Sequence, residues 1–74
     1  MKTKEQVQIE LGKSLRRYRL LRNWSIEKLA LETGLTYSQV GRIELGKRNA
    51  TIYTVYLLTK TLEIKTSEML DTID

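Results

Sequence analysis

The chain contains no cysteine, histidine, proline or phenylalanine among its 74 residues. Without cysteine there is no disulfide framework, and without histidine as well zinc would have only carboxylates as ligands, so we expect no structural metal and no cofactor. The apolar runs are far shorter than the roughly 20 residues that span a bilayer, and no signal-peptide core is present. We therefore expect a cytoplasmic protein without a membrane partner, in keeping with the missing cysteine.

The chain also lacks the residues on which most enzyme active sites depend. Besides histidine and cysteine, the chain lacks a pair of carboxylates on a common helix face and a glycine-rich phosphate loop, so we expect no enzyme. The length allows one small domain. We place this domain at residues 7–74 and expect residues 1–6 to form a flexible arm or the frayed start of a helix.

Positive charge is concentrated in the middle of the chain, whose overall net charge is +4. Residues 12–50 carry nine basic and three acidic side chains, which gives +6. Residues 51–74 carry two basic and four acidic side chains, which gives −2. The sequence therefore indicates a polyanion as the partner, and the simpler alternative is a basic surface that only keeps the protein soluble.

Periodicity and capping residues predict five helices and an all-α fold. The first helix is predicted over residues 6–22, where apolar residues recur at spacings of three and four, and Asn23 ends it in the left-handed conformation. Residues able to cap the first turn predict four further helices: Ser25, Thr36, Thr51 and Thr66. Glycines at positions 34 and 46 end the second and third helices.

Residues 25–46 combine the second helix, a short turn and the third helix. Ala30 is small where the two helices must cross closely, and Gly34 makes the turn. Four apolar residues are spaced to lock the helices together: Leu29, Leu35, Val40 and Ile43. This pattern predicts a helix-turn-helix, which holds its second helix where that helix can enter the major groove of DNA.

Several short motifs share one register along residues 11–70. The main pieces are Leu11-Gly12, Trp24-Ser25, Leu29-Ala30, Gly34-Leu35-Thr36, Arg42-Ile43-Glu44 and Gly46-Lys47-Arg48-Asn49. On these pieces the chain resembles the phage-repressor/Cro-type, or XRE-type, helix-turn-helix family, whose short members include restriction–modification controller proteins. The resemblance implies a five-helix, lambda-repressor-like DNA-binding domain with double-stranded DNA as its partner.

The resemblance also implies which residues contact DNA. Bases would be read by the exposed start of the third helix: Tyr37, Ser38, Gly41 and Arg42. An arginine forks onto guanine O6 and N7, which is the commonest specific contact. Phosphates would be contacted from the starts of two helices and from the loop after the third: Ser25, Thr36, Gln39, Lys47, Arg48 and Asn49. The alternative for both sets is that they are ordinary solvated residues.

Three positions keep more than one interpretation or depart from the family. Gln39 either closes a capping box with Thr36 or donates to a phosphate. Gly41 either lets DNA approach closely or has no role. Many family members have glutamine at the first position of the second helix, where it binds phosphate, whereas this chain has Ile26.

An ion pair is implied between Arg19 and Glu44. In the family, an arginine and a glutamate at these positions join the first helix to the end of the third, partly buried. Because a buried charge must be paired, we assign both residues to architecture rather than to recognition.

The C-terminal part holds more apolar residues than a five-helix core can bury. The resemblance implies that some of them form the interface of a homodimer on a palindromic operator: Tyr53, Tyr56, Leu57, Met69, Leu70 and Ile73. Scattered surface hydrophobes are the simpler alternative. A competing function uses the same surface, since an antitoxin-like protein-interaction module would bind another chain through its last helices.

Overall fold

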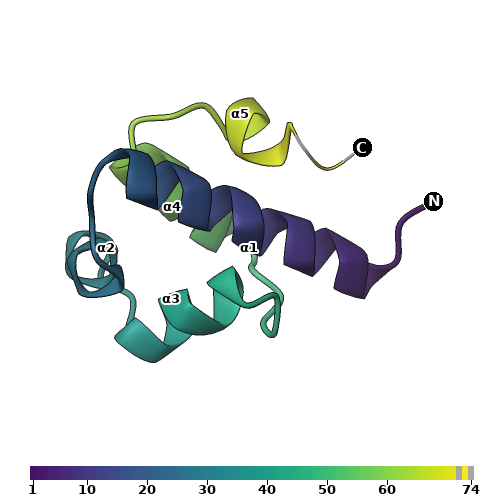
Figure 1. Cartoon of the computed structure of the whole chain (residues 1–74), viewed down its shortest axis with the longest axis horizontal. Coiled ribbons are helices and arrows are strands. Elements are labelled where there is room, and N and C mark those ends of the chain that lie inside the picture. Colours follow the sequence, from purple (N-terminus) through teal and green to yellow (C-terminus); the bar gives the residue numbers. More distant parts are fainter. Residues whose placement is uncertain (72, 74) are drawn as a thin grey trace.

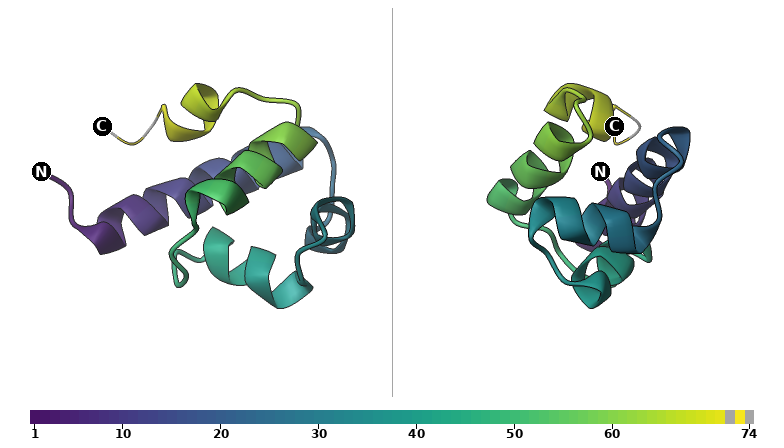
Figure 2. Two further views of the ribbon diagram at one scale, coloured as in Figure 1. Left: turned by 180° about the vertical axis from the view of Figure 1, so that it is seen from behind. Right: turned by 90° about the vertical axis from the view of Figure 1, so that its left-hand side faces the viewer.

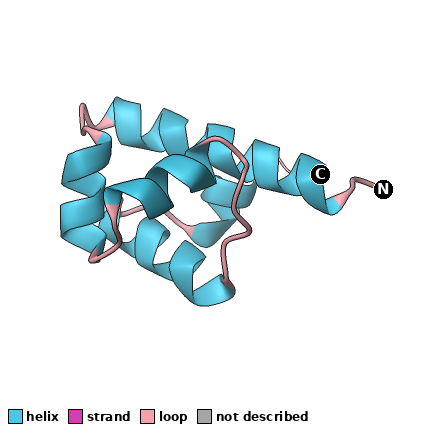
Figure 3. Cartoon of the chain, turned by 90° about the horizontal axis from the view of Figure 1, so that it is seen from below, coloured by secondary structure: helices cyan, strands magenta, loops and turns pink. Residues whose placement is uncertain are grey.

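The computed structural model describes residues 1–71 and 73, and in this part of the chain it contains helices and no strands (Figures 1 and 3). The five helices are α1 (Lys4–Leu21), α2 (Ile26–Thr33), α3 (Tyr37–Glu44), α4 (Ile52–Thr61) and α5 (Thr66–Leu70). The predicted all-α, five-helix fold is confirmed. Within the described residues, no helix has both the length and the apolar character needed to cross a membrane.

Helix α1 runs through the middle of the molecule and organises the rest (Figures 1 and 2). It packs against α3 on one side and α5 on another, while α2 packs against α3 and α4. One cluster of buried side chains joins all five helices: Leu11, Leu15, Leu29, Ala30, Val40, Ile43, Leu58, Leu62 and Met69. Helices α2 and α3 are thereby fixed to the body of the protein by their inner faces.

Three of the four predicted capping residues hold their helices as expected. The side chains of Ser25, Thr36 and Thr51 each accept a hydrogen bond from the amide three residues later. Helix α5 differs, because its N-cap is Lys65 and Thr66 is its first residue. The carboxylate of Glu68 accepts a hydrogen bond from the Lys65 amide at 2.9 Å, which places the cap one residue earlier.

The first helix begins earlier than its apolar periodicity predicts. Thr3 is the N-cap of α1, and the helix starts at Lys4, so residues 4–6 form its first turn. The cause is a capping box in which Gln6 donates its amide to the Thr3 hydroxyl and accepts from the Thr3 amide at 2.8 Å. This polar signal lies ahead of the first apolar residue of the pattern.

Helix α1 approaches the end of α3 closely at Gly12. A β-carbon built at Gly12 would meet the backbone carbonyl oxygens of Ile43 and Glu44 well inside van der Waals contact. Glycine at this position therefore lets the two helices touch backbone to backbone. This contact fixes the height at which α3 sits on α1.

Candidate nucleic-acid interface

The turn between α2 and α3 is made by Gly34 in the left-handed conformation, with φ at 80°. Such a φ costs glycine little and other residues much more. Beyond the turn, the inner faces of both helices are buried, with Leu29, Val40 and Ile43 almost inaccessible to solvent. The helix-turn-helix is therefore a rigid unit that presents the outer faces of α2 and α3 to solvent.

The residues predicted to read bases lie together on this outer face. Tyr37, Ser38 and Arg42 are exposed, and Gly41 between them is half-buried. A β-carbon at Gly41 would have no heavy atom within 4 Å, so the helix surface is open at that position. Arg42 makes no ion pair with any described residue, which leaves its guanidinium available for a base edge.

The predicted phosphate-binding residues divide between the starts of two helices and one loop. Ser25 and Thr36 are N-caps whose hydroxyls accept from amides of α2 and α3. Gln39 closes the capping box of α3, because its side-chain oxygen accepts from the Thr36 amide at 2.8 Å. A phosphate contact by the remaining amide group of Gln39 stays a prediction. The first amides of each helix point outward at the positive end of a helix dipole.

The loop after α3 carries the other predicted phosphate contacts. Gly46 starts it in the left-handed conformation, with φ at 73°. Lys47, Arg48 and Asn49 follow, and all three are exposed. Neither Lys47 nor Arg48 forms an ion pair within the described part of the chain. Positive charge therefore lies directly beyond the C-terminal end of α3.

Arg19 and Glu44 form a buried, two-pronged ion pair between α1 and the end of α3. The Arg19 Nε donates to one Glu44 carboxylate oxygen at 2.6 Å, and Nη2 donates to the other at 2.9 Å. The two side chains are only 9% and 6% exposed. The hydrogen bond to Glu44 raises the pKa of the Arg19 guanidinium. Nη1 also donates to the Trp24 carbonyl at 2.7 Å, so the pair also fixes the turn before α2.

Comparison with known proteins gives the family of this arrangement. A family model described as helix-turn-helix matches residues 15–69, which include α2, α3 and the loop that follows. The chain belongs to the helix-turn-helix family. The match covers the ion pair, the turn and the outer face of α3 in one register.

Several helix-turn-helix relatives are restriction–modification controller proteins. The chain is 35% identical over 60 residues to the control protein C.SmaI of Serratia marcescens, covering 81% of this chain and 71% of the relative. Among solved structures, the controller protein C.AhdI of Aeromonas hydrophila is 34% identical with a TM-score of 0.81, over 84% of this chain and 94% of that chain. A helix-turn-helix transcriptional regulator from Vibrio cholerae is 25% identical with a TM-score of 0.89, over 96% of this chain and 40% of that one.

One residue of the α3 surface in this helix-turn-helix protein was missed by the sequence analysis. Leu45, the C-cap of α3, is 66% exposed. It lies four residues after Gly41 and eight after Tyr37, so the three positions share one helix face. An exposed leucine in that place suits contact with a thymine methyl group. The i, i+4, i+8 spacing was the signal available in the sequence.

The predicted dimer surface is only partly exposed. Tyr53 and Tyr56 are exposed and stack on each other with ring centroids 6.3 Å apart, and Leu70 is 40% exposed. Including Met69 was wrong, because its side chain is fully buried where α5 packs on α1. Leu57 and Ile73 are half-buried, and Ile73 packs against the core.

A hydrogen bond between α1 and α5 holds α5 in the orientation that buries Met69. The Ser14 hydroxyl of α1 donates to the Met69 carbonyl at 2.6 Å, and Ser14 itself is buried. The residues left for a partner are therefore Tyr53, Tyr56 and Leu70, with parts of Leu57 and Ile73.

Proposed function

We propose that this helix-turn-helix protein, a sequence-specific DNA-binding transcription regulator, inserts α3 into the major groove of double-stranded DNA as a homodimer on a palindromic operator. The observation that carries the proposal is the outer face of α3. It presents Tyr37, Ser38 and Arg42 to solvent from a helix whose inner face is locked into the core. The groove of B-DNA is wide enough to accept such a helix.

The charges around α3 support the same geometry. Lys47 and Arg48 extend from its C-terminal end, while the capped starts of α2 and α3 lie at the other. A helix in the major groove lies between two phosphate strands, so basic or amide groups at both ends meet phosphate while the middle meets bases. Three described acidic residues of the C-terminal part belong to α5 and the segments flanking it, away from this face: Glu63, Glu68 and Asp71 (Figure 1).

Replacing Arg42 and Lys47 separately tests base reading against phosphate binding. We expect Arg42→Ala to cost about 1–3 kcal/mol on the best site and to relax the preference at one base pair, because a two-pronged contact to guanine is lost. Lys47→Ala should weaken binding to all sequences alike and reduce the slope of log affinity against log salt by about one unit. Fluorescence anisotropy on specific and scrambled duplexes at several salt concentrations measures both effects.

Each of these variants serves as the control for the other, since both remove one exposed positive charge near α3. If Arg42→Ala lowers affinity equally for specific and scrambled DNA, the assignment of Arg42 to the major groove is wrong. If neither variant nor the wild-type protein binds double-stranded DNA, the hypothesis of an antitoxin-like interaction module is favoured instead.

The proposed dimer is supported by an apolar groove on the side formed by α1, α4 and α5. Its walls include Val7 and Leu11 from α1, Val55 and Tyr56 from α4, and Leu70 from α5. Ile52 also lines the groove and is 89% exposed. The next residue of α4, Tyr53, is 66% exposed and extends the apolar surface. A contiguous apolar surface of this kind is typical of a protein interface.

Two copies joined through this surface would double the base contacts. One recognition helix touches too few base pairs to select a site in a genome, whereas two-fold related helices about 34–36 Å apart read two half-sites one DNA turn apart. The interface from so small a chain is expected to be modest in area, so the monomer is populated at low concentration.

A charge placed in the groove should separate the copies. We expect Tyr56→Asp to weaken self-association by more than about tenfold, or ~1.4 kcal/mol, because the carboxylate would be buried unpaired. Leu31→Asp is the matched control, since Leu31 is 78% exposed on α2, outside this surface. Sedimentation equilibrium measures both. A wild-type protein that stays monomeric at high concentration and on palindromic DNA would contradict the dimer.

The controller relatives suggest which process this regulator serves. C.AhdI is a restriction–modification controller protein by name. We extend that role to this chain, as a cytoplasmic regulator that controls a restriction–modification system.

A further inference from the structure

A hollow beside α3 brings together residues from three helices. Arg16 of α1, Ile26 of α2, and Tyr37 and Gly41 of α3 all line it. Tyr37 and Gly41 are two of the residues on the outer face of α3, so the hollow opens beside the surface assigned to base reading. The sequence alone assigned no role to Arg16.

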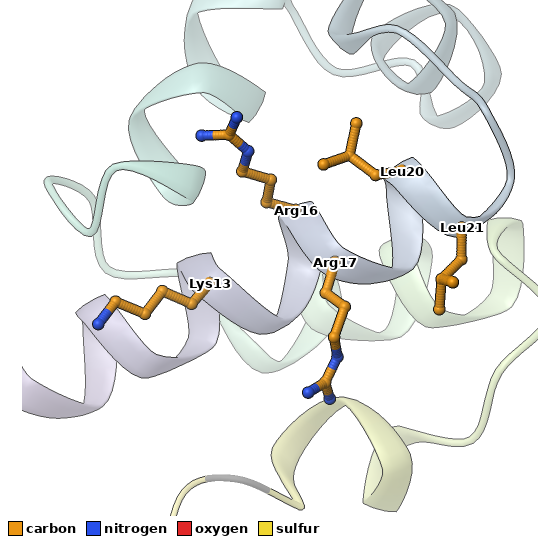
Figure 4. Close-up of a pocket in the computed structure, with 5 residues that line it drawn as sticks. All are labelled: Lys13, Arg16, Arg17, Leu20 and Leu21. Carbon is orange, nitrogen blue, oxygen red and sulfur yellow. The ribbon is translucent and has the colours of Figure 1, made fainter.

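Arg16 is the available positive charge of this hollow. Arg19 and Glu44 also line it, but they neutralise each other in the ion pair. Arg16 is exposed and makes no hydrogen bond or ion pair with another residue in the part of the chain that is described. Figure 4 shows its guanidinium directed from α1 toward α3.

The neighbouring arginine behaves differently. Figure 4 shows Arg17 leaving α1 in a different direction, toward α5. Its guanidinium lies 5.2 Å from the centre of the Tyr18 ring. The chain therefore offers two consecutive arginines of which only one faces the helix-turn-helix.

The side chain at the start of α2, Ile26, cannot donate a hydrogen bond to a phosphate, so a donor must come from another helix. Ile26 is apolar and half-buried at the first position of α2, so it offers no hydrogen bond to an anion. The hollow extends along α3 from its first residue, Tyr37, to Leu45. A phosphate strand flanking a helix in the major groove passes beside the start of that helix, which this hollow includes. Arginine suits such a contact because its planar guanidinium forms two-pronged hydrogen bonds with phosphate oxygens.

We propose that Arg16 binds a phosphate of the DNA strand that flanks the start of α3, supplying from α1 the contact that Ile26 cannot make. This inference rests on the proposed insertion of α3 into the major groove. Arg16 thereby acts as a positioning residue, since a phosphate contact sets the register of the protein on the duplex without distinguishing bases.

The pair Arg16→Gln and Arg17→Gln tests the proposal, because both variants lose the same charge from adjacent positions. Binding of the full chain to specific and scrambled duplexes is measured between 50 and 200 mM salt. For one phosphate contact the salt slope falls by about 0.9. We expect Arg16→Gln to show this fall, so that its affinity drops about 3.5-fold less than that of the wild type over this salt range. Arg17→Gln should keep the wild-type slope.

A single uncharged methylphosphonate, moved along the half-site, locates the contact. We expect one position beside the start of α3 where the neutral linkage weakens the wild type and Arg17→Gln but leaves Arg16→Gln unchanged. Equal slopes for both variants, or a changed base preference in Arg16→Gln, would overturn the assignment. If the wild type binds DNA and Arg42→Ala weakens that binding, but Arg16→Gln has the affinity and salt slope of the wild type, only this inference fails. Absence of wild-type DNA binding would overturn the proposed function as well.

Discussion

Glu44→Ala is expected to lower the free energy of unfolding by about 3–5 kcal/mol, because it leaves the buried Arg19 guanidinium without its carboxylate. A domain of this size has a total stability of roughly 4–11 kcal/mol. The change also removes the link between α1 and the end of α3. We therefore expect a protein that is largely unfolded well below the wild-type melting temperature, as measured by circular dichroism and urea denaturation.

Two further variants identify the cause. Glu32→Ala is the matched control, because Glu32 pairs with Lys28 at 3.3 Å on the exposed face of α2, where an ion pair contributes at most about 0.5 kcal/mol. The double variant Arg19→Met, Glu44→Leu should recover much of the loss, since no charge is then buried unpaired. A Glu44→Ala protein that melts with the wild type would show that the pair adds nothing to stability.

Gly12→Ala is expected to destabilise the fold by about 2–3 kcal/mol, although alanine favours helix more than glycine does. The added methyl group meets the carbonyl oxygens of Ile43 and Glu44, and backbone atoms cannot rotate aside as a flexible side chain would. Helix α1 must therefore move away from α3. Urea denaturation measures the loss, and the affinity for operator DNA should fall with it because α3 shifts on the body.

Gly41→Ala is the control, since it makes the same change in a helix with open space around it. With nothing within 4 Å of the new β-carbon, we expect this variant to be more stable than the wild type by about 1 kcal/mol. Any fall in its DNA affinity would then report close approach of DNA at Gly41. Equal stability changes for the two alanine variants would contradict the close packing of α1 on α3.

Local chemistry explains why much of the fold could be predicted. Ser25, Thr36 and Thr51 each satisfy an amide three residues later, a rule that needs no tertiary information. The left-handed Gly34 and Asn23 likewise mark chain reversals by their own conformational preferences. With the apolar spacing of α1, these signals determine the helices and their order.

The remaining features depend on how the helices pack. Met69 and Leu70 are adjacent apolar residues of α5, and only the contact of α5 with α1 decides that Met69 points inward. Arg16 and Arg17 are likewise indistinguishable in the sequence, but one faces α3 and the other faces α5. Leu45 has an apolar side chain like those of the core, yet it is exposed on the outer face where α3 ends.

Selection of bound sequences from a random pool of duplex DNA tests the central claim, that α3 reads bases in the major groove. The pool is incubated with the wild-type protein at moderate salt and sequenced over successive rounds. We predict enrichment of a palindrome whose half-sites are about one helical turn apart. The same selection with Arg42→Ala should lose the preference at one base pair in each half-site. A wild-type selection that enriches no sequence over the starting pool would contradict the account.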